Sequence, residues 1–316
     1  MKQFFSPDEL PLVDGRVYHL DLAPDELAQD VLVVGDPDRV PLLADEFLEK
    51  READRYHRGF RSITGLVRET GMRVSIVTSG IGAPSTEIVL NELVALNEID
   101  FQSRVRKESF TPLNIIRIGT SGGINPANPL GTLVLTEYVI GLDNSGLFYN
   151  IPPPDIQSTL LVKQAIAALN RAADQGAPFY GAILPYVARA DRNLLLGLED
   201  EAAALGLPYV RGITVSSPGF FSGEGRGVAR IRSTFPRLIE EFGTMDTGRI
   251  GLKVENIEME AGIILHFLGG MKYSAAAICV VINKRQEDIF MADYRRHVCD
   301  AARVALRALS NIKREG

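Results

Sequence analysis

The sequence has few cysteines and histidines, and their spacing favours neither disulfides nor a metal site. Cys279 and Cys299 belong to no CxxC pair and are too few for a disulfide framework. The four histidines are scattered, at positions 19, 57, 266 and 297. We therefore expect a reduced, cytoplasmic compartment and no clustered metal site.

Long apolar runs and an excess of basic residues are also missing. The N-terminal stretch MKQFFSPDELPLVDG has no apolar region typical of a secretory signal, and no run is long enough to span a bilayer. The net charge of -6 and the pI of about 5.4 argue against a broad surface for nucleic acid or anionic membrane. Any anion site must therefore be local.

Familiar nucleotide-binding motifs are absent as well. Residues 79–86, SGIGAPST, lack the GK[ST] ending of a P-loop and do not match GxGxxG. Their glycines allow a tight turn, and Ser85 or Thr86 is predicted to cap a helix over residues 87–98. We find no repeat, low-complexity tract or linker, so residues 1–316 are predicted to form one domain whose first 17 residues are loosely ordered.

Short apolar runs alternate with helical patterns along most of the chain, which predicts an α/β fold. The predicted strands cover residues 30–34, 73–78, 114–124, 130–140, 209–216 and 275–282. Helices are predicted over residues 157–173, 227–253 and 291–313, and in the charged segment before Tyr56.

The segment at residues 254–284, VENIEMEAGIILHFLGGMKYSAAAICVVINK, is predicted to form a helix, a Gly-Gly stop and a buried strand. Two carboxylates, Glu258 and Glu260, flank Met259 where this helix is predicted to begin. They could be simple partners of the helix dipole or ligand-binding groups. The segment alone leaves both interpretations open.

Charged residues also mark the other predicted strands. Arg117 interrupts an apolar strand, where its charge requires either an internal ion pair or a bound anion. The loop at residues 217–226, SPGFFSGEGR, combines two phenylalanines with an acid and an arginine, and could form a pocket wall or an ordinary core and surface contact. Because ligands gather at the carboxyl ends of strands in α/β folds, one crevice is predicted to contain Arg39, Thr120, Glu224, Arg226, Glu258 and Glu260.

Six segments, in the order GDPDRV, SGIGAPST, RIGTSGGI, FFSGEGR, NIEMEAG and VVINK, carry a family resemblance. Together they resemble the nucleoside phosphorylase family of the purine/uridine type, most closely its uridine-type members, over roughly residues 18–310. The resemblance implies a single α/β domain with a mixed central sheet partly closed into a barrel and flanked by helices. It also implies a homodimer or a trimer of dimers with sites shared across the dimer interface.

The implied activity is that of a pentosyltransferase. It would cleave the N-glycosidic bond of a uridine-like nucleoside, giving (deoxy)ribose 1-phosphate and free base. Inorganic phosphate is the co-substrate, and no cofactor or metal is required.

The resemblance further implies a role for each site residue. Phosphate would be held by Gly35, Arg39, Arg117, Thr120 and Arg58 of the partner subunit. Ribose would be held by Glu258, Met259, Glu260 and His19 of the partner subunit. The base would be held by Thr120, Ser121, Gly122, Phe220, Glu224, Arg226 and Ile282. Those implied to be catalytic are Arg117, Arg226 and Glu260, because they face the phosphate dianion, the leaving base and the ribose hydroxyls.

Three residues depart from the family pattern. Uridine-type members have Gln where this chain has Glu224, which leaves the identity of the base open. Bacterial purine-type members have a catalytic Asp at the strand-end position occupied here by Lys284, which argues against that route to purines. Gly59 cannot supply the Glu with which some uridine-type members bind a monovalent cation.

The alternatives are a phosphorylase for a purine or modified pyrimidine, a related hydrolase, and a non-catalytic nucleoside-binding protein on the same fold. A hydrolase would leave the three arginines without a purpose.

Overall fold

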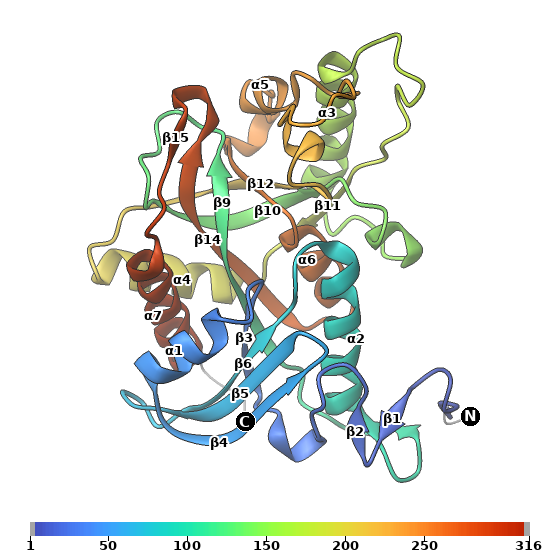
Figure 1. Cartoon of the computed structure of the whole chain (residues 1–316), viewed down its shortest axis with the longest axis vertical. Coiled ribbons are helices and arrows are strands. Elements are labelled where there is room, and N and C mark those ends of the chain that lie inside the picture. The colour runs from blue at the N-terminus through green and yellow to red at the C-terminus, as the bar shows by residue number, and fades with distance from the viewer. Residues whose placement is uncertain (1–3, 313–316) are drawn as a thin grey trace.

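The computed structural model describes residues 4–312, which form one α/β domain with a mixed sheet (Figure 1). The described α-helices are α1 (Arg39–Phe47), α2 (Ala83–Glu98), α3 (Ile156–Ala172), α4 (Arg192–Ala204), α5 (Leu238–Gly243), α6 (Ala261–Gly270) and α7 (Arg295–Asn311). The strands are β1 (Leu12–Val13), β2 (Arg16–Val17), β3 (Asp30–Val34), β4 (Leu48–His57), β5 (Phe60–Val67), β6 (Arg73–Thr78), β7 (Ile99–Asp100), β8 (Val105–Arg106), β9 (Asn114–Gly123), β10 (Leu133–Gly141), β11 (Tyr186–Arg189), β12 (Tyr209–Ser216), β13 (Val254–Glu258), β14 (Ser274–Lys284) and β15 (Ile289–Phe290).

Five strands of the main sheet close on themselves. They follow the order β14-β10-β12-β13-β9, and β9 also pairs in parallel with β14, which completes the ring. The open part of the sheet continues from β9 through β3, β6, β5 and β4. Figure 1 shows the ring in the upper half of the molecule and the open strands below it. This is the mixed, partly closed sheet that the sequence resemblance implied.

Helices cover both faces of this sheet. Helices α1, α4 and α7 lie on one side, and α2 and α6 lie on the other (Figure 1). Their apolar faces and the open strands share one large core, whereas α3 and α5 close a second core against the ring. Strand β9 belongs to both parts, since it pairs with β3, β13 and β14. Strand β9 therefore lies in the interior of the sheet, and most of its residues are buried.

Three predicted strands, residues 30–34, 73–78 and 209–216, match β3, β6 and β12. The predictions for 114–124, 130–140, 275–282 and 157–173 are shifted by at most a few residues from β9, β10, β14 and α3. The predicted closing helix begins later, since α7 starts at Arg295.

Other predictions were wrong, and tertiary pairing explains most of them. The charged segment before Tyr56 is helical only to Phe47 and continues as β4, an exposed strand that pairs with β5. Residues 254–258 form β13 instead of a helix start, because they pair with β12 and β9. Of residues 227–253, the described helical parts are α5 and a short turn at Gly248–Ile250.

The capping prediction for α2 was also wrong. The helix begins at Ala83, before the two hydroxyl residues. Their side chains donate hydrogen bonds to carbonyl oxygens, Ser85 to that of Ser79 and Thr86 to that of Gly82. A hydroxyl cap would instead accept from a backbone N–H group.

The N-terminal part is held against the domain where the structure describes it. Strands β1 and β2 form a small hairpin, and Leu10 is buried beside Ile99. The Arg104 side chain donates hydrogen bonds to the carbonyl oxygens of Phe5 and Ser6. Among the described residues, no helix is long and apolar enough to cross a membrane.

Candidate active site

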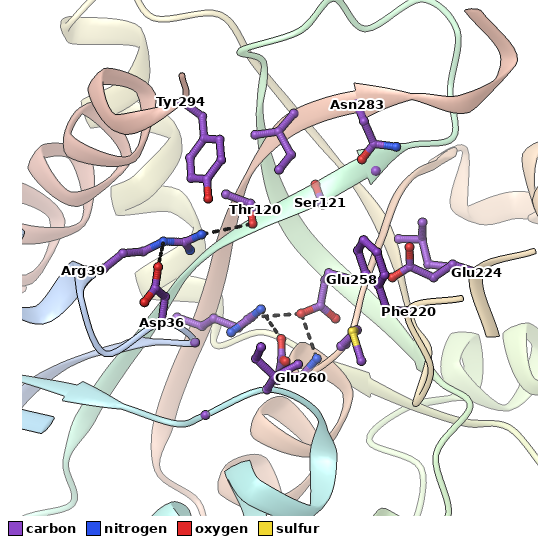
Figure 2. Close-up of a pocket in the computed structure, with 18 of the residues that line it drawn as sticks. Asp36, Arg39, Thr120, Ser121, Phe220, Glu224, Glu258, Glu260, Asn283 and Tyr294 are labelled. Carbon is purple, nitrogen blue, oxygen red and sulfur yellow. Dashed lines mark hydrogen bonds and ion pairs between the residues drawn. The ribbon is translucent and has the colours of Figure 1, made fainter. Parts of the chain in front are cut away.

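A cavity of about 580 Å³ lies where the ring and the open sheet meet (Figure 2). Its walls come from the segments that follow β3, β6, β12 and β13, from the distal halves of β9 and β14, and from the start of α7. Segments that are far apart in the sequence therefore meet around one cavity. The lining residues include Gly35, Arg39, Arg117, Thr120, Ser121, Gly122, Phe220, Glu224, Arg226, Glu258, Met259, Glu260 and Ile282.

Arg117 is the central charge of the cavity, and its side chain is almost fully buried. Its Nε donates to Glu258 at 2.9 Å, and its Nη2 donates to Glu260. Its Nη1 is buried and lacks a hydrogen-bond partner within residues 4–312. Burial opposes the charge, but Glu260 and Glu258 outweigh it and raise the pKa of the guanidinium. Both sequence-based interpretations of Arg117 therefore keep support: two nitrogens are in an internal ion pair, and the third has no partner among the described residues.

The two carboxylates have different environments. Glu258 accepts backbone hydrogen bonds from Glu260 at 2.9 Å and from Ala261 at 3.0 Å, so it closes the amino end of α6. Glu260 accepts from the backbone of Gly82 at 2.6 Å, which ties the site to the start of α2. Burial raises the pKa of Glu260 despite the opposing charge of Arg117. Both interpretations of this segment therefore apply: Glu258 stabilises the start of α6, and Glu258 and Glu260 both line the cavity.

One end of the cavity collects groups suited to an anion. Arg39 starts α1, and its Nη2 lies 3.4 Å from the Thr120 hydroxyl. Its Nε lies 3.8 Å from Asp36, and its guanidinium faces the ring of Tyr294. Figure 2 shows these four side chains around one corner of the cavity. Gly35 lies in the preceding turn, close to the backbone of Gly80.

The opposite end contains a buried acid paired with an arginine. Arg226 donates to the Glu224 carboxylate, and its Cζ stands 3.9 Å from the centroid of the Phe220 ring. Arg285 donates to the carbonyl oxygen of Gly225 at 2.9 Å, which holds the loop in place. Burial raises the pKa of the Glu224 carboxyl to about 7. This carboxyl therefore changes charge near neutral pH.

A buried polar chain fixes the barrel wall next to this end. Ser121 accepts a hydrogen bond from the Asn256 side chain at 2.9 Å, and Asn256 in turn accepts from Thr214 at 2.8 Å. Thr214 is also hydrogen-bonded to Thr136 at 2.7 Å inside the ring. Because every member has a partner, the chain holds the Ser121 hydroxyl in one orientation.

His19 and Arg58 do not line the cavity; Arg58 is exposed and His19 is half-buried. Arg58 and Gly59 form the two-residue turn between β4 and β5, with φ values of 52° and 85°. The Arg58 guanidinium lies over the ring of Tyr18, and His19 Nδ1 lies 2.8 Å from a carboxylate oxygen of Glu92. The fold thus brings together two residues that the resemblance assigned to a partner's site.

The sequence-based prediction that Lys284 occupies the place of the catalytic Asp of purine-type members was wrong. Lys284 is turned away from the cavity, where it donates to the Pro126 carbonyl oxygen at 2.8 Å and pairs with Glu287. The side chain of β14 that lines the cavity at this point is Asn283. An amide is not a catalytic acid, so the argument against that route holds with a different residue.

Sequence reasoning missed several lining residues. They are Asp36, Pro37, Gly80, Ile81, Ile257, Asn283 and Tyr294. Six of them lie within the six sequence segments that carry the family resemblance, so their position in these segments could have suggested them. Tyr294 lies outside every motif, and no sequence signal pointed to it.

Among residues 4–312, no group of three or more His, Cys, Asp or Glu side chains could hold a metal ion. Both cysteines are unpaired, and burial raises the pKa of the Cys279 thiol to about 12.

Comparison with known proteins defines the class. The family model of the phosphorylase superfamily matches residues 29–310, so the chain belongs to this superfamily.

Within the superfamily, the chain is similar to uridine phosphorylases over most of its length. It is 28% identical over 290 residues to the uridine phosphorylase of Thermococcus kodakarensis, covering 92% of this chain and 85% of that protein. It is 27% identical to the Escherichia coli uridine phosphorylase, covering 86% and 88% of the two chains. A DeoD-type purine nucleoside phosphorylase of Roseobacter denitrificans is 30% identical, but over 59% of this chain.

A solved structure has the same fold. A nucleoside phosphorylase of Trypanosoma brucei, which shows uridine phosphorylase activity, superimposes with a TM-score of 0.86 at 29% identity. The match covers 95% of this chain and 99% of that one.

Proposed function

We propose that the chain catalyses phosphorolysis of a uridine-like nucleoside, giving (deoxy)ribose 1-phosphate and the free base. The observation that carries this proposal is Arg117, a buried guanidinium that pairs with two carboxylates and still has an unpartnered nitrogen among the described residues. A buried donor without a partner is costly, and a phosphate oxygen would satisfy it. The similarity to uridine phosphorylases over most of the chain supports the same reaction.

The cavity divides naturally into three parts for such a substrate. Phosphate would bind at the end that contains Gly35, Arg39 and Thr120, next to Arg117. Ribose would lie over the segment Glu258, Met259 and Glu260. The base would occupy the space lined by Thr120, Ser121, Gly122, Phe220, Glu224, Arg226 and Ile282.

This arrangement suits the charge changes of phosphorolysis. The sugar becomes positively charged as the glycosidic bond breaks, and the phosphate dianion attacks it. Carboxylates that accept the ribose hydroxyls would fix the sugar's orientation, since bound geometry lowers the barrier. Arg226 would stabilise negative charge on the departing base. No step in this scheme requires a metal or organic cofactor.

The charge balance of the cavity favours a site completed by a partner subunit. Three arginines line the cavity, and they face four carboxyl groups, those of Asp36, Glu224, Glu258 and Glu260. A dianion therefore needs additional positive charge. Arg58 is exposed at a hairpin tip and His19 lies beside it, so both would reach the cavity of a neighbouring copy in a homodimer or a trimer of dimers.

Two further properties complete the proposal. We place the enzyme in the cytoplasm, in nucleoside catabolism and salvage, which fits its unpaired cysteines. We expect no monovalent cation at position 59, because Gly59 has no side chain that could bind one. Its φ of 85° is also one that other residues rarely adopt.

The direct test is a phosphorolysis screen over uridine, thymidine, cytidine, inosine and guanosine, with and without phosphate. Phosphate-dependent release of base together with pentose 1-phosphate is the expected result for uridine or a close analogue. Release of free ribose without phosphate would instead identify a hydrolase. Nucleoside binding without turnover would identify a binding protein.

Glu224→Gln tests which base the site accepts. The Glu224 carboxyl has a pKa of about 7. At a pH below this value it holds a proton and can donate as well as accept a hydrogen bond, as an amide does. Above it, the carboxylate only accepts and opposes charge on the leaving base. We expect wild-type uridine phosphorolysis to fall as the pH rises through about 7, and the Gln variant to be faster above that pH. Profiles of kcat/KM against pH, from about pH 6 to about pH 9, measure the difference.

Guanosine is assayed beside uridine, since an ionised carboxylate matches the adjacent ring N–H and amino group of guanine. If uridine turnover is undetectable in both forms and guanosine turnover disappears in the variant, the pyrimidine assignment is wrong. Glu241→Gln is the matched control. Glu241 lies on α5, outside the cavity, where it is buried and accepts a hydrogen bond from Arg171 of α3 at 2.6 Å.

A further inference from the structure

Tyr294, the residue immediately before α7, stands at the phosphate end of the cavity. It also lines a second cavity of about 430 Å³, which shares Asp36 and Arg39 with the first. Tyr294 therefore borders both cavities and lies between the proposed phosphate position and the second cavity.

The Tyr294 side chain has two features that suit a phosphate site. The Cζ atom of Arg39 lies 5.3 Å from its ring centroid, which is within the range of a cation–π contact. Its hydroxyl points into the cavity toward Thr120 and the guanidinium of Arg39 (Figure 2). A phenol in this place can fix the arginine with its ring and donate a hydrogen bond with its hydroxyl.

The donors that this chain offers at the same end are few. Two nitrogens of Arg117 are already committed to Glu258 and Glu260. Arg39 lies between Asp36 and Thr120 and has its own neighbours. A phosphate dianion has several oxygens that accept charge-assisted hydrogen bonds, and a neutral hydroxyl can add one donor without adding charge beside the carboxylates.

We propose that Tyr294 is a further phosphate-binding residue, whose hydroxyl donates to a phosphate oxygen while its ring holds the Arg39 guanidinium in place. This inference rests on the proposed phosphorolysis and extends it to a residue outside the family motifs. Tyr294 would act on the phosphate half of the reaction only, since it is remote from the base end at Glu224 and Phe220 (Figure 2).

Two substitutions separate the hydroxyl from the ring. Tyr294→Phe keeps the aromatic face toward Arg39 and removes the donor, whereas Tyr294→Leu removes both. We expect Tyr294→Phe to raise the KM for phosphate about tenfold, as for a lost hydrogen bond to a charged group, with the KM for the nucleoside unchanged. Tyr294→Leu should raise the KM for phosphate further. Tyr149→Phe is the matched control, because the Tyr149 hydroxyl bonds Glu87 and Asn91 outside the cavity.

Phosphate binding measured by calorimetry without nucleoside gives a second readout that a general loss of structure would not mimic. An unchanged KM and affinity for phosphate in folded Tyr294→Phe would overturn the proposal, whatever Tyr294→Leu does. Equal rises in the KM values for phosphate and nucleoside would also overturn it. If the wild-type enzyme shows no phosphate-dependent turnover, the proposed function fails first, so the two failures are distinguishable.

Discussion

Arg117→Met is expected to abolish nearly all phosphorolysis. The change removes the charge that we propose faces phosphate, a loss of about 2–5 kcal/mol for a buried charge-assisted contact. This corresponds to a fall of roughly thirtyfold to several thousandfold in kcat/KM. Steady-state kinetics with varied phosphate measures the effect.

The same substitution should also destabilise the fold. Glu258 and Glu260 would be left buried without their common partner, and breaking a buried pair from one side costs about 3–5 kcal/mol. Thermal unfolding therefore accompanies the kinetics. Arg211→Met, which removes a partner of the buried Glu137 outside the cavity, is the control for stability without a role in phosphate binding.

Arg117→Lys keeps the test decisive if the methionine variant does not fold. A lysine retains a positive charge between the carboxylates but has a single ammonium group, so it cannot reproduce the third, unpartnered nitrogen. An unchanged KM for phosphate in this folded variant would contradict the assignment of Arg117.

Mixed subunits are expected to recover activity that neither parent has. Arg58→Ala and Glu260→Ala should each be nearly inactive if the site is shared, because each lacks one half of it. In a mixed dimer, one cavity combines an intact Glu260 with an intact Arg58 from its neighbour. Random exchange at equal concentrations should restore about a quarter of the wild-type sites.

A matched pair of variants controls for this result. Glu260→Ala mixed with Arg117→Lys should show no recovery, because both residues line the cavity of a single chain. Subunit exchange is verified with two differently tagged chains. Equal recovery in both mixtures, or none in the first despite exchange, would argue against a site shared between subunits.

The sequence correctly predicted that the cavity lies at the carboxyl ends of strands. It was less successful in predicting which segments around the cavity are helices and which are strands. The buried strand β3 carries a continuous apolar run, Val31 to Val34, so its bounds were correct. Strand β13 contains two glutamates and an asparagine, and in isolation it has the composition of a helix start. Its conformation is decided by pairing with β12 and β9, which are distant in sequence.

The same distinction applies to the cavity. Residues that follow a predicted strand, such as Arg39 after residues 30–34 and Glu224 after residues 209–216, could be predicted because strand ends converge in α/β folds. Tyr294 could not, because its position depends on how α7 packs on β9 and β14. The pairing of Arg117 with both carboxylates, which leaves one nitrogen for a ligand, also required coordinates.

Strand β9 sets a length scale for whatever binds. Arg117, Thr120, Ser121 and Gly122 follow one another along it, and a strand advances about 3.3 Å per residue. The distance between the anion end and the base end is thus a fixed interval of backbone, held on both sides by β3, β13 and β14. Inserting one residue would reverse the orientation of every side chain beyond it. If the proposed assignment of the cavity is correct, the loop that contains Phe220 and Glu224 can change to suit a different base without altering this spacing or the anion end.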